Sequence, residues 1–66
     1  MPYATVEDLP RNLREHLPAH AQEIYKEAFN NALQQYSNER TAFRVAWSAV
    51  KKQYEKGLDG FWRPRD

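Results

Sequence analysis

Residues 18–37 carry the longest amphipathic pattern in the chain, and this pattern most limits what the chain can fold into. Apolar side chains recur there every three or four positions, at Ala21, Ile24, Tyr25, Ala28, Phe29, Ala32 and Tyr36. This spacing lines one face of an α-helix, whereas a strand would show strict alternation. Pro18 suits the start of such a helix, because the first helical position has no partner for a backbone N–H. We therefore predict one long helix onto which the rest of the chain folds.

A shorter helix is predicted before the long one, over residues 10–16. Asp8 is a good N-cap for it, because a side-chain oxygen at that position accepts a hydrogen bond from the free amides of the first turn. Leu9, Leu13 and Leu17 are spaced by four and form a single apolar stripe. This stripe is expected to lie on the long helix.

A third helix is predicted over residues 40–56, after a short polar turn. Its expected contact face consists of Phe43, Ala46, Trp47, Val50 and Tyr54. Gly57 is expected to end the helix, because glycine readily takes the left-handed conformation that terminates many helices. Val45 and Ala49 project on nearly the opposite side, where we expect the first helix or the tail to cover them; the alternative is a small partner surface.

The aromatic pair Phe61 and Trp62 follows this helix, and we expect Trp62 to dock on the domain, beside Tyr3. A minor β pairing between the N- and C-terminal segments would bring these aromatic residues together. The predicted fold is therefore mainly all-α. It is a small bundle of three helices that forms a single domain over residues 1–66.

Several functional classes find no support in the residues. The chain has no cysteine and only two glycines, which removes thiolate chemistry and glycine-rich phosphate loops. His16 and His20 are separated by the helix break at Pro18, so they do not share the one-face spacing that a metal site needs. We predict no catalytic residue, no metal site, no cofactor, no small-molecule substrate and no enzymatic activity. No apolar run approaches the length of a bilayer span and no signal sequence is evident, so we expect a soluble, cytoplasmic protein.

Charge is distributed unevenly along the chain. Residues 1–39 carry a net charge of −3 and residues 40–66 a net charge of +4. On the third helix, Arg40, Arg44 and Lys51 lie within about 40° of one another. Such a stripe suits a phosphate backbone or the acidic cytoplasmic face of a membrane protein. The alternative is that these charges simply coat a solvated helix face.

Asn30 is the other candidate interaction residue. It is placed on the outward side of the long helix, where asparagine is a poor helix former and has no capping role. Its side chain is expected either to hydrogen-bond to the returning tail or to face a partner.

Four segments together resemble the ChaB family, which consists of small bacterial proteins described as regulators of a cation transporter. They are MPY at the start, DLP at residues 8–10, LPAHAQEIYKEAFNNA at 17–32 and AWSAVKKQYEKG at 46–57. The resemblance implies a mainly helical cytoplasmic protein whose partner is a sodium or calcium/proton antiporter. Family members carry a longer charged stretch between the second and third helices, where this chain has only residues 37–41. The resemblance transfers no catalytic or binding residue.

Two main hypotheses of function follow. The first is a regulatory module that docks on a cytoplasmic loop of an antiporter through Asn30, through the stripe of Arg40, Arg44 and Lys51, or through both. The second is a nucleic-acid-binding module that uses the basic third helix and the tail. A third possibility is an assembly helper that dimerises through Val45 and Ala49.

Overall fold

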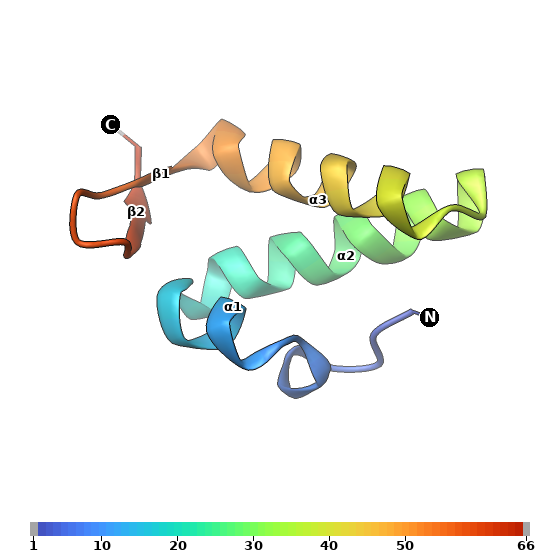
Figure 1. Ribbon diagram of the computed structural model, residues 1–66, viewed down its shortest axis with the longest axis horizontal. Helices are drawn as coiled ribbons and strands as arrows, with labels where there is room; N and C mark the ends of the chain where they lie inside the picture. The colour runs from blue at the N-terminus through green and yellow to red at the C-terminus, as the bar shows by residue number, and fades with distance from the viewer. Residues whose placement is uncertain (1, 66) are drawn as a thin grey trace.

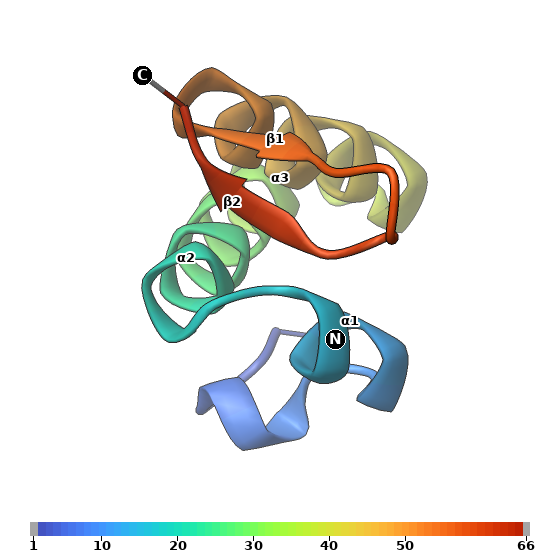
Figure 2. The same ribbon diagram turned by 90° about the vertical axis from the view of Figure 1, so that its left-hand side faces the viewer.

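The computed structural model describes residues 2–65, and two antiparallel helices form its body. Helix α2 (Ala19–Tyr36) and helix α3 (Glu39–Gln53) lie side by side, and the short helix α1 (Arg11–His16) packs against α2 from another direction (Figure 1). The view along the helices shows α1 and α3 flanking α2, with the C-terminal hairpin placed across that end (Figure 2). The predicted bundle of three helices is confirmed.

The prolines set the starts of the first two helices. Pro10 and Pro18 both occupy the N-cap position, with extended ψ values of 146° and 161°. The expected N-cap Asp8 lies instead in a short 3₁₀ turn, Val6–Asp8, where its carboxylate accepts a hydrogen bond from the Thr5 amide at 3.2 Å. The prediction of Asp8 as the cap of α1 was therefore wrong, because the 3₁₀ turn uses its carboxylate.

A two-residue turn joins α2 to α3. Ser37 ends α2 in the left-handed region at φ 54°, and its amide donates to the Leu33 carbonyl at 2.8 Å. Asn38 then caps α3, because its side-chain oxygen accepts a hydrogen bond from the Thr41 amide at 3.0 Å. The tight turn forces the two helices to run antiparallel.

The core lies between α2 and the elements on either side of it. Its buried residues are Leu9, Leu13, Leu17, Ala21, Tyr25, Phe29, Ala32, Ala42, Ala46, Val50 and Tyr54. Ala42 and Ala46 are fully buried on α3, so small side chains let that helix approach α2 closely. The prediction that Phe43 belongs to this contact face was wrong, because its side chain is 51% exposed.

Helix α3 ends at Gln53, three residues earlier than predicted, because Tyr54 adopts an extended conformation. A hairpin of two strands follows, β1 (Tyr54–Lys56) and β2 (Trp62–Pro64), paired antiparallel with Lys56 opposite Trp62. A minor β pairing is thus present, but it joins the end of the third helix to the tail rather than the N-terminal to the C-terminal segment. Gly57 lies in the hairpin connection and does not terminate the helix.

The hairpin carries Trp62 onto the bundle. Its ring packs against Trp47 with ring centroids 5.2 Å apart, so the tail does dock as expected. Tyr3 does not take part in this contact, because its ring lies against Phe29 with a centroid distance of 4.9 Å. The two terminal segments therefore dock on different aromatic residues of the helices.

Candidate interaction site

The three basic residues of the predicted stripe all lie on the surface of α3. Arg40, Arg44 and Lys51 are exposed, and no ion pair to any of them is formed within residues 2–65. An unpaired guanidinium or ammonium group can bind an external anion without first losing an internal partner. These three positions therefore remain candidates for partner contact.

Asn30 has a different environment from the basic stripe. Its side-chain oxygen accepts the Tyr3 amide at 2.8 Å, and its side-chain nitrogen donates to the Tyr3 carbonyl at 2.8 Å. The expected contact with the C-terminal tail is not formed, because the N-terminal segment takes this place. Asn30 thus attaches the segment before α1 to α2.

An open groove runs above α2 between α1 and α3. It consists of two adjoining cavities, of about 640 Å³ and about 480 Å³. Asn12, Leu13 and Trp47 line both of them, so the two volumes are parts of one elongated depression. We call this depression the α1–α3 groove.

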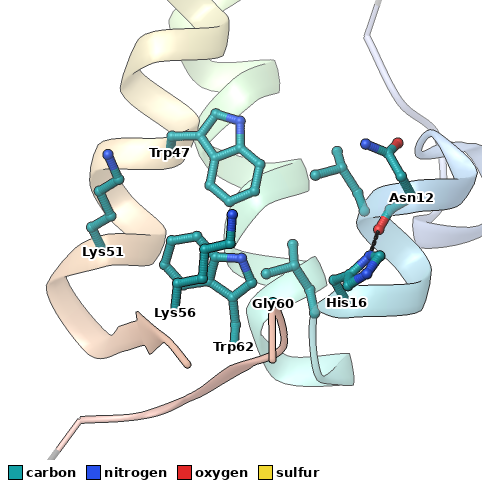
Figure 3. A pocket seen from close by; sticks show the side chains of 9 residues that line it. Asn12, His16, Trp47, Lys51, Lys56, Gly60 and Trp62 are labelled. Atoms are coloured by element: carbon teal, nitrogen blue, oxygen red, sulfur yellow. Dashed lines mark hydrogen bonds between the residues drawn. The ribbon is translucent and has the colours of Figure 1, made fainter. Parts of the chain in front are cut away.

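The larger cavity is lined by residues of α1, α3 and the hairpin. Figure 3 shows Trp47 and Trp62 near its centre, with Lys51 on one side, His16 on the other, and the Lys56 side chain overlapping Trp62 in this view. Both tryptophans are half-buried, and their rings are inclined by 32°. The lining of this cavity therefore combines two tryptophans with two cations.

The smaller cavity continues the groove toward the N-terminal segment. Its aromatic lining comprises Tyr3, Tyr25, Phe29, Phe43 and Trp47, and Arg40 lies at its edge. Burial raises the pKa of Tyr25 to about 12, so its hydroxyl is neutral at any physiological pH. Apart from Asn12, aromatic and aliphatic side chains line this part of the groove, and its charged residues are Glu39 and Arg40 on α3.

The basic stripe follows the α3 edge of this groove. Arg40 lines the smaller cavity and Lys51 the larger one. A neighbouring hollow on α3 is lined by Arg44 and Lys51 together with the aromatic residues Phe43 and Trp47. The sequence prediction of an aligned stripe on one helix is thus joined in the structure to an apolar surface.

The two histidines hold structural hydrogen bonds. His16 Nδ1 lies 2.8 Å from the Asn12 carbonyl oxygen, and His20 Nδ1 lies 3.0 Å from the Tyr54 hydroxyl. No cluster of three or more potential metal ligands occurs in the part of the chain that the structure describes.

None of the helices described has both the length and the apolar character that crossing a bilayer demands.

The outer face of α3 carries the pair Val45 and Ala49. Val45 is 37% exposed and Ala49 is half-buried, with Arg44 and Lys52 beside them. The expected cover by the first helix or the tail is not provided for Val45, because both elements pack elsewhere. Lys52 lies on this outer face, away from the groove that Lys51 lines.

Sequence reasoning missed Lys56 and His16 as groove residues. Lys56 was assigned to the third helix, where it would point to another side, and the hairpin instead places it beside Trp62. The Asp59-Gly60 dipeptide before Phe61 is a turn signal that predicts such a hairpin. No signal in the sequence places His16 against Phe61, where their ring centroids are 5.0 Å apart.

Comparison with known proteins gives consistent matches. Residues 9–65 match the family model described as ChaB. A protein of Escherichia coli K12 named "Putative cation transport regulator ChaB" is 49% identical over 75 residues, covering 98% of this chain and 99% of that protein. A Shigella flexneri protein with the same name matches equally well. The solution structure entitled "NMR solution structure of the putative cation transport regulator ChaB" has a TM-score of 0.89 at 48% identity, covering 98% of this chain and all of that one.

Proposed function

The chain belongs to the ChaB family, and from this premise we propose that it regulates cation transport by binding a membrane cation/proton antiporter. The names of its relatives support the regulatory role, and the family resemblance supports the antiporter as partner. In this proposal the chain acts through contact and performs no chemical step of its own.

The observation that carries the proposal is the unpaired basic stripe beside an apolar groove. Arg40, Arg44 and Lys51 are exposed, form no ion pair within the described residues, and border the aromatic lining of the α1–α3 groove. Protein interfaces characteristically combine an aromatic or aliphatic centre with a charged rim. Asn30 contributes to the same surface indirectly, because it holds Tyr3 at the far end of the groove.

The groove also fits a difference between this chain and its relatives. The alignment with the Escherichia coli protein is longer than this chain, so the relative carries residues that are missing here. Only a two-residue turn joins α2 to α3 in this chain. A regulatory contact by this chain would therefore use surfaces that it does carry, such as the α1–α3 groove.

Association with the antiporter tests the proposal directly. We expect the purified chain to co-purify with the detergent-solubilised antiporter and to change cation flux in antiporter vesicles. Substitution of Arg40, Arg44 and Lys51 by glutamate should abolish both effects, because it places three negative charges at the contact. The control is Lys52→Glu, a single charge reversal at a residue of the same helix that lines neither cavity of the groove, and it should retain both effects. No association of the wild-type chain, together with unchanged flux, would refute the proposal.

A nucleic-acid-binding module is the second candidate, favoured by the exposed alignment of Arg40, Arg44 and Lys51. Binding to single- or double-stranded nucleic acid should then weaken steeply with salt, because phosphate contacts release counterions. Arg44→Glu combined with Lys51→Glu should remove it. Binding that is insensitive to these substitutions, or absent at low salt, would exclude this candidate.

A further inference from the structure

We propose that the α1–α3 groove is a docking site for an acidic amphipathic peptide segment. An apolar side chain of the segment enters the cavity beside Trp47 and Trp62. Carboxylates of the same segment pair with Lys51 and Lys56. The inference deepens the proposed function and rests on it only for the identity of the protein that carries the segment.

The shape of the groove favours a chain segment as its occupant. The two cavities share Asn12, Leu13 and Trp47, so together they form an elongated depression that is open along one side. A small molecule is usually held in a closed pocket that covers most of its surface. A helix or extended peptide, by contrast, can lie along an open groove and insert single side chains.

The aromatic centre of the larger cavity provides the place for an anchoring side chain. Its volume of about 640 Å³ exceeds that of any one side chain, and Leu13 and Leu17 add aliphatic surface to the two tryptophans. Trp62 is held in place by pairing with β1, and Trp47 by the body of α3. Aromatic residues in a partly desolvated cavity are typical centres of binding energy.

Charge decides which kind of segment fits. Lys51 and Lys56 line the cavity, are exposed, and form no ion pair with any other residue in the 2–65 range. The facing wall, formed by Asn12 and His16, carries no carboxylate. A bound glutamate or aspartate therefore meets two cations and no opposing acid in this cavity, whereas a basic segment would be repelled.

The same observations favour a peptide over nucleic acid. A nucleobase binds by stacking on an open aromatic face. Trp47 already contacts the rings of Tyr25, Phe43 and Trp62, at centroid distances of 5.3, 6.3 and 5.2 Å.

The test uses a synthetic peptide of glutamate and alanine with two central leucines, added to the full chain at low salt. Binding is followed by the emission of the two tryptophans and by amide NMR shifts. We expect saturable binding, with shifts at Trp47, Lys51 and Trp62. Two control peptides, with the leucines changed to alanine or the glutamates to glutamine, should each bind at least about 10-fold more weakly.

Variants of the chain locate the site. Lys51→Glu and Lys56→Glu should each weaken binding about 10-fold, since each reverses a charge beside the bound carboxylates. Lys52→Glu is the matched control and should leave the affinity within about twofold. All three lysines are exposed, so these variants are expected to fold, and amide spectra verify this. Trp62→Ala should also weaken binding, and if that variant unfolds, the lysine variants decide.

Three results would overturn the inference. The first is equal binding of the leucine and alanine peptides. The second is an equal loss of peptide affinity in Lys51→Glu and Lys52→Glu. The third is tighter binding of oligo-dT than of the acidic peptide. The peptide-binding test and the antiporter-association test can give different results, so the two proposals can fail independently. Antiporter association without peptide binding would refute the groove alone, whereas peptide binding without antiporter association would refute the antiporter as the partner.

Discussion

At the residue scale, Asn30 shows how a polar side chain on a helix can serve the fold. Its amide group forms two hydrogen bonds with the backbone of Tyr3, one as acceptor and one as donor. This geometry imitates the pairing of two strands, and it satisfies two backbone groups that would otherwise need water. It also fixes the Tyr3 ring against Phe29. A structural role thus accounts for the asparagine at this position.

We predict that Asn30→Ala destabilises the chain by roughly 1–3 kcal/mol, because two hydrogen bonds with a net value of about 0.5–1.5 kcal/mol each are lost. Urea unfolding measures the change. Asn31→Ala is the matched control, since it makes the same substitution at the neighbouring exposed position of α2, where only helix propensity changes. Equal stability of the two variants would show that the Tyr3 contact does not stabilise the chain.

At the element scale, the helices were predictable from the sequence because each buries a regular apolar stripe. Leu9, Leu13 and Leu17 are buried as their spacing indicates, and the long helix lies within one residue of its predicted bounds. The end of α3 was not predictable from the same pattern. Tyr54 continues the helical spacing of Val50 and is buried, yet its backbone is extended. Tertiary pairing with the tail, which a local pattern does not contain, decides its conformation.

The candidate site, like the fold, was only partly predictable from the sequence. The basic stripe was predictable because Arg40, Arg44 and Lys51 all lie on one helix, so their relative placement depends only on helical geometry. The groove was not predictable, because its walls come from α1, α3 and the hairpin. Lys56 joins Lys51 there only because the chain leaves the helix before it.

The hairpin depends on Gly60, which has a φ of +89° in the connection between the strands. A β-carbon at this position would lie 3.8 Å from His16 Cδ2, which is an ordinary contact. A side chain would therefore be unfavourable because of the positive φ, which residues other than glycine rarely adopt. We predict that Gly60→Ala destabilises the hairpin by about 1–3 kcal/mol. Tryptophan emission should shift to longer wavelength as Trp62 separates from Trp47.

Leu58→Ala is the control for Gly60→Ala, because Leu58 belongs to the same connection and is fully exposed. It should leave both the emission maximum and the urea midpoint unchanged. If Gly60→Ala behaves like Leu58→Ala, the connection tolerates a side chain at this φ, and Gly60 does not define the hairpin.

At the scale of the whole molecule, the buried residues are distributed unevenly among the elements. Helix α2 contributes Ala21, Tyr25, Phe29 and Ala32, and α3 contributes Ala42, Ala46 and Val50. The hairpin buries only Tyr54. Regions with few buried contacts open at a lower free energy than the cooperative core. The end wall of the α1–α3 groove is thus its least stable part.

We therefore predict two classes of amide in native-state hydrogen exchange. Amides of the buried α2 and α3 residues should exchange only through global unfolding, at a free energy of roughly 3–10 kcal/mol for a chain of this size. The hairpin amides of Gly57 and Arg65, which donate to Phe61 and Gln53, should exchange at a clearly lower free energy. Their exchange should also depend little on urea, because local opening exposes little surface. Exchange of Gly57 and Arg65 at the same free energy as Phe29 and Ala46 would contradict this, because the hairpin would then unfold only together with the helices.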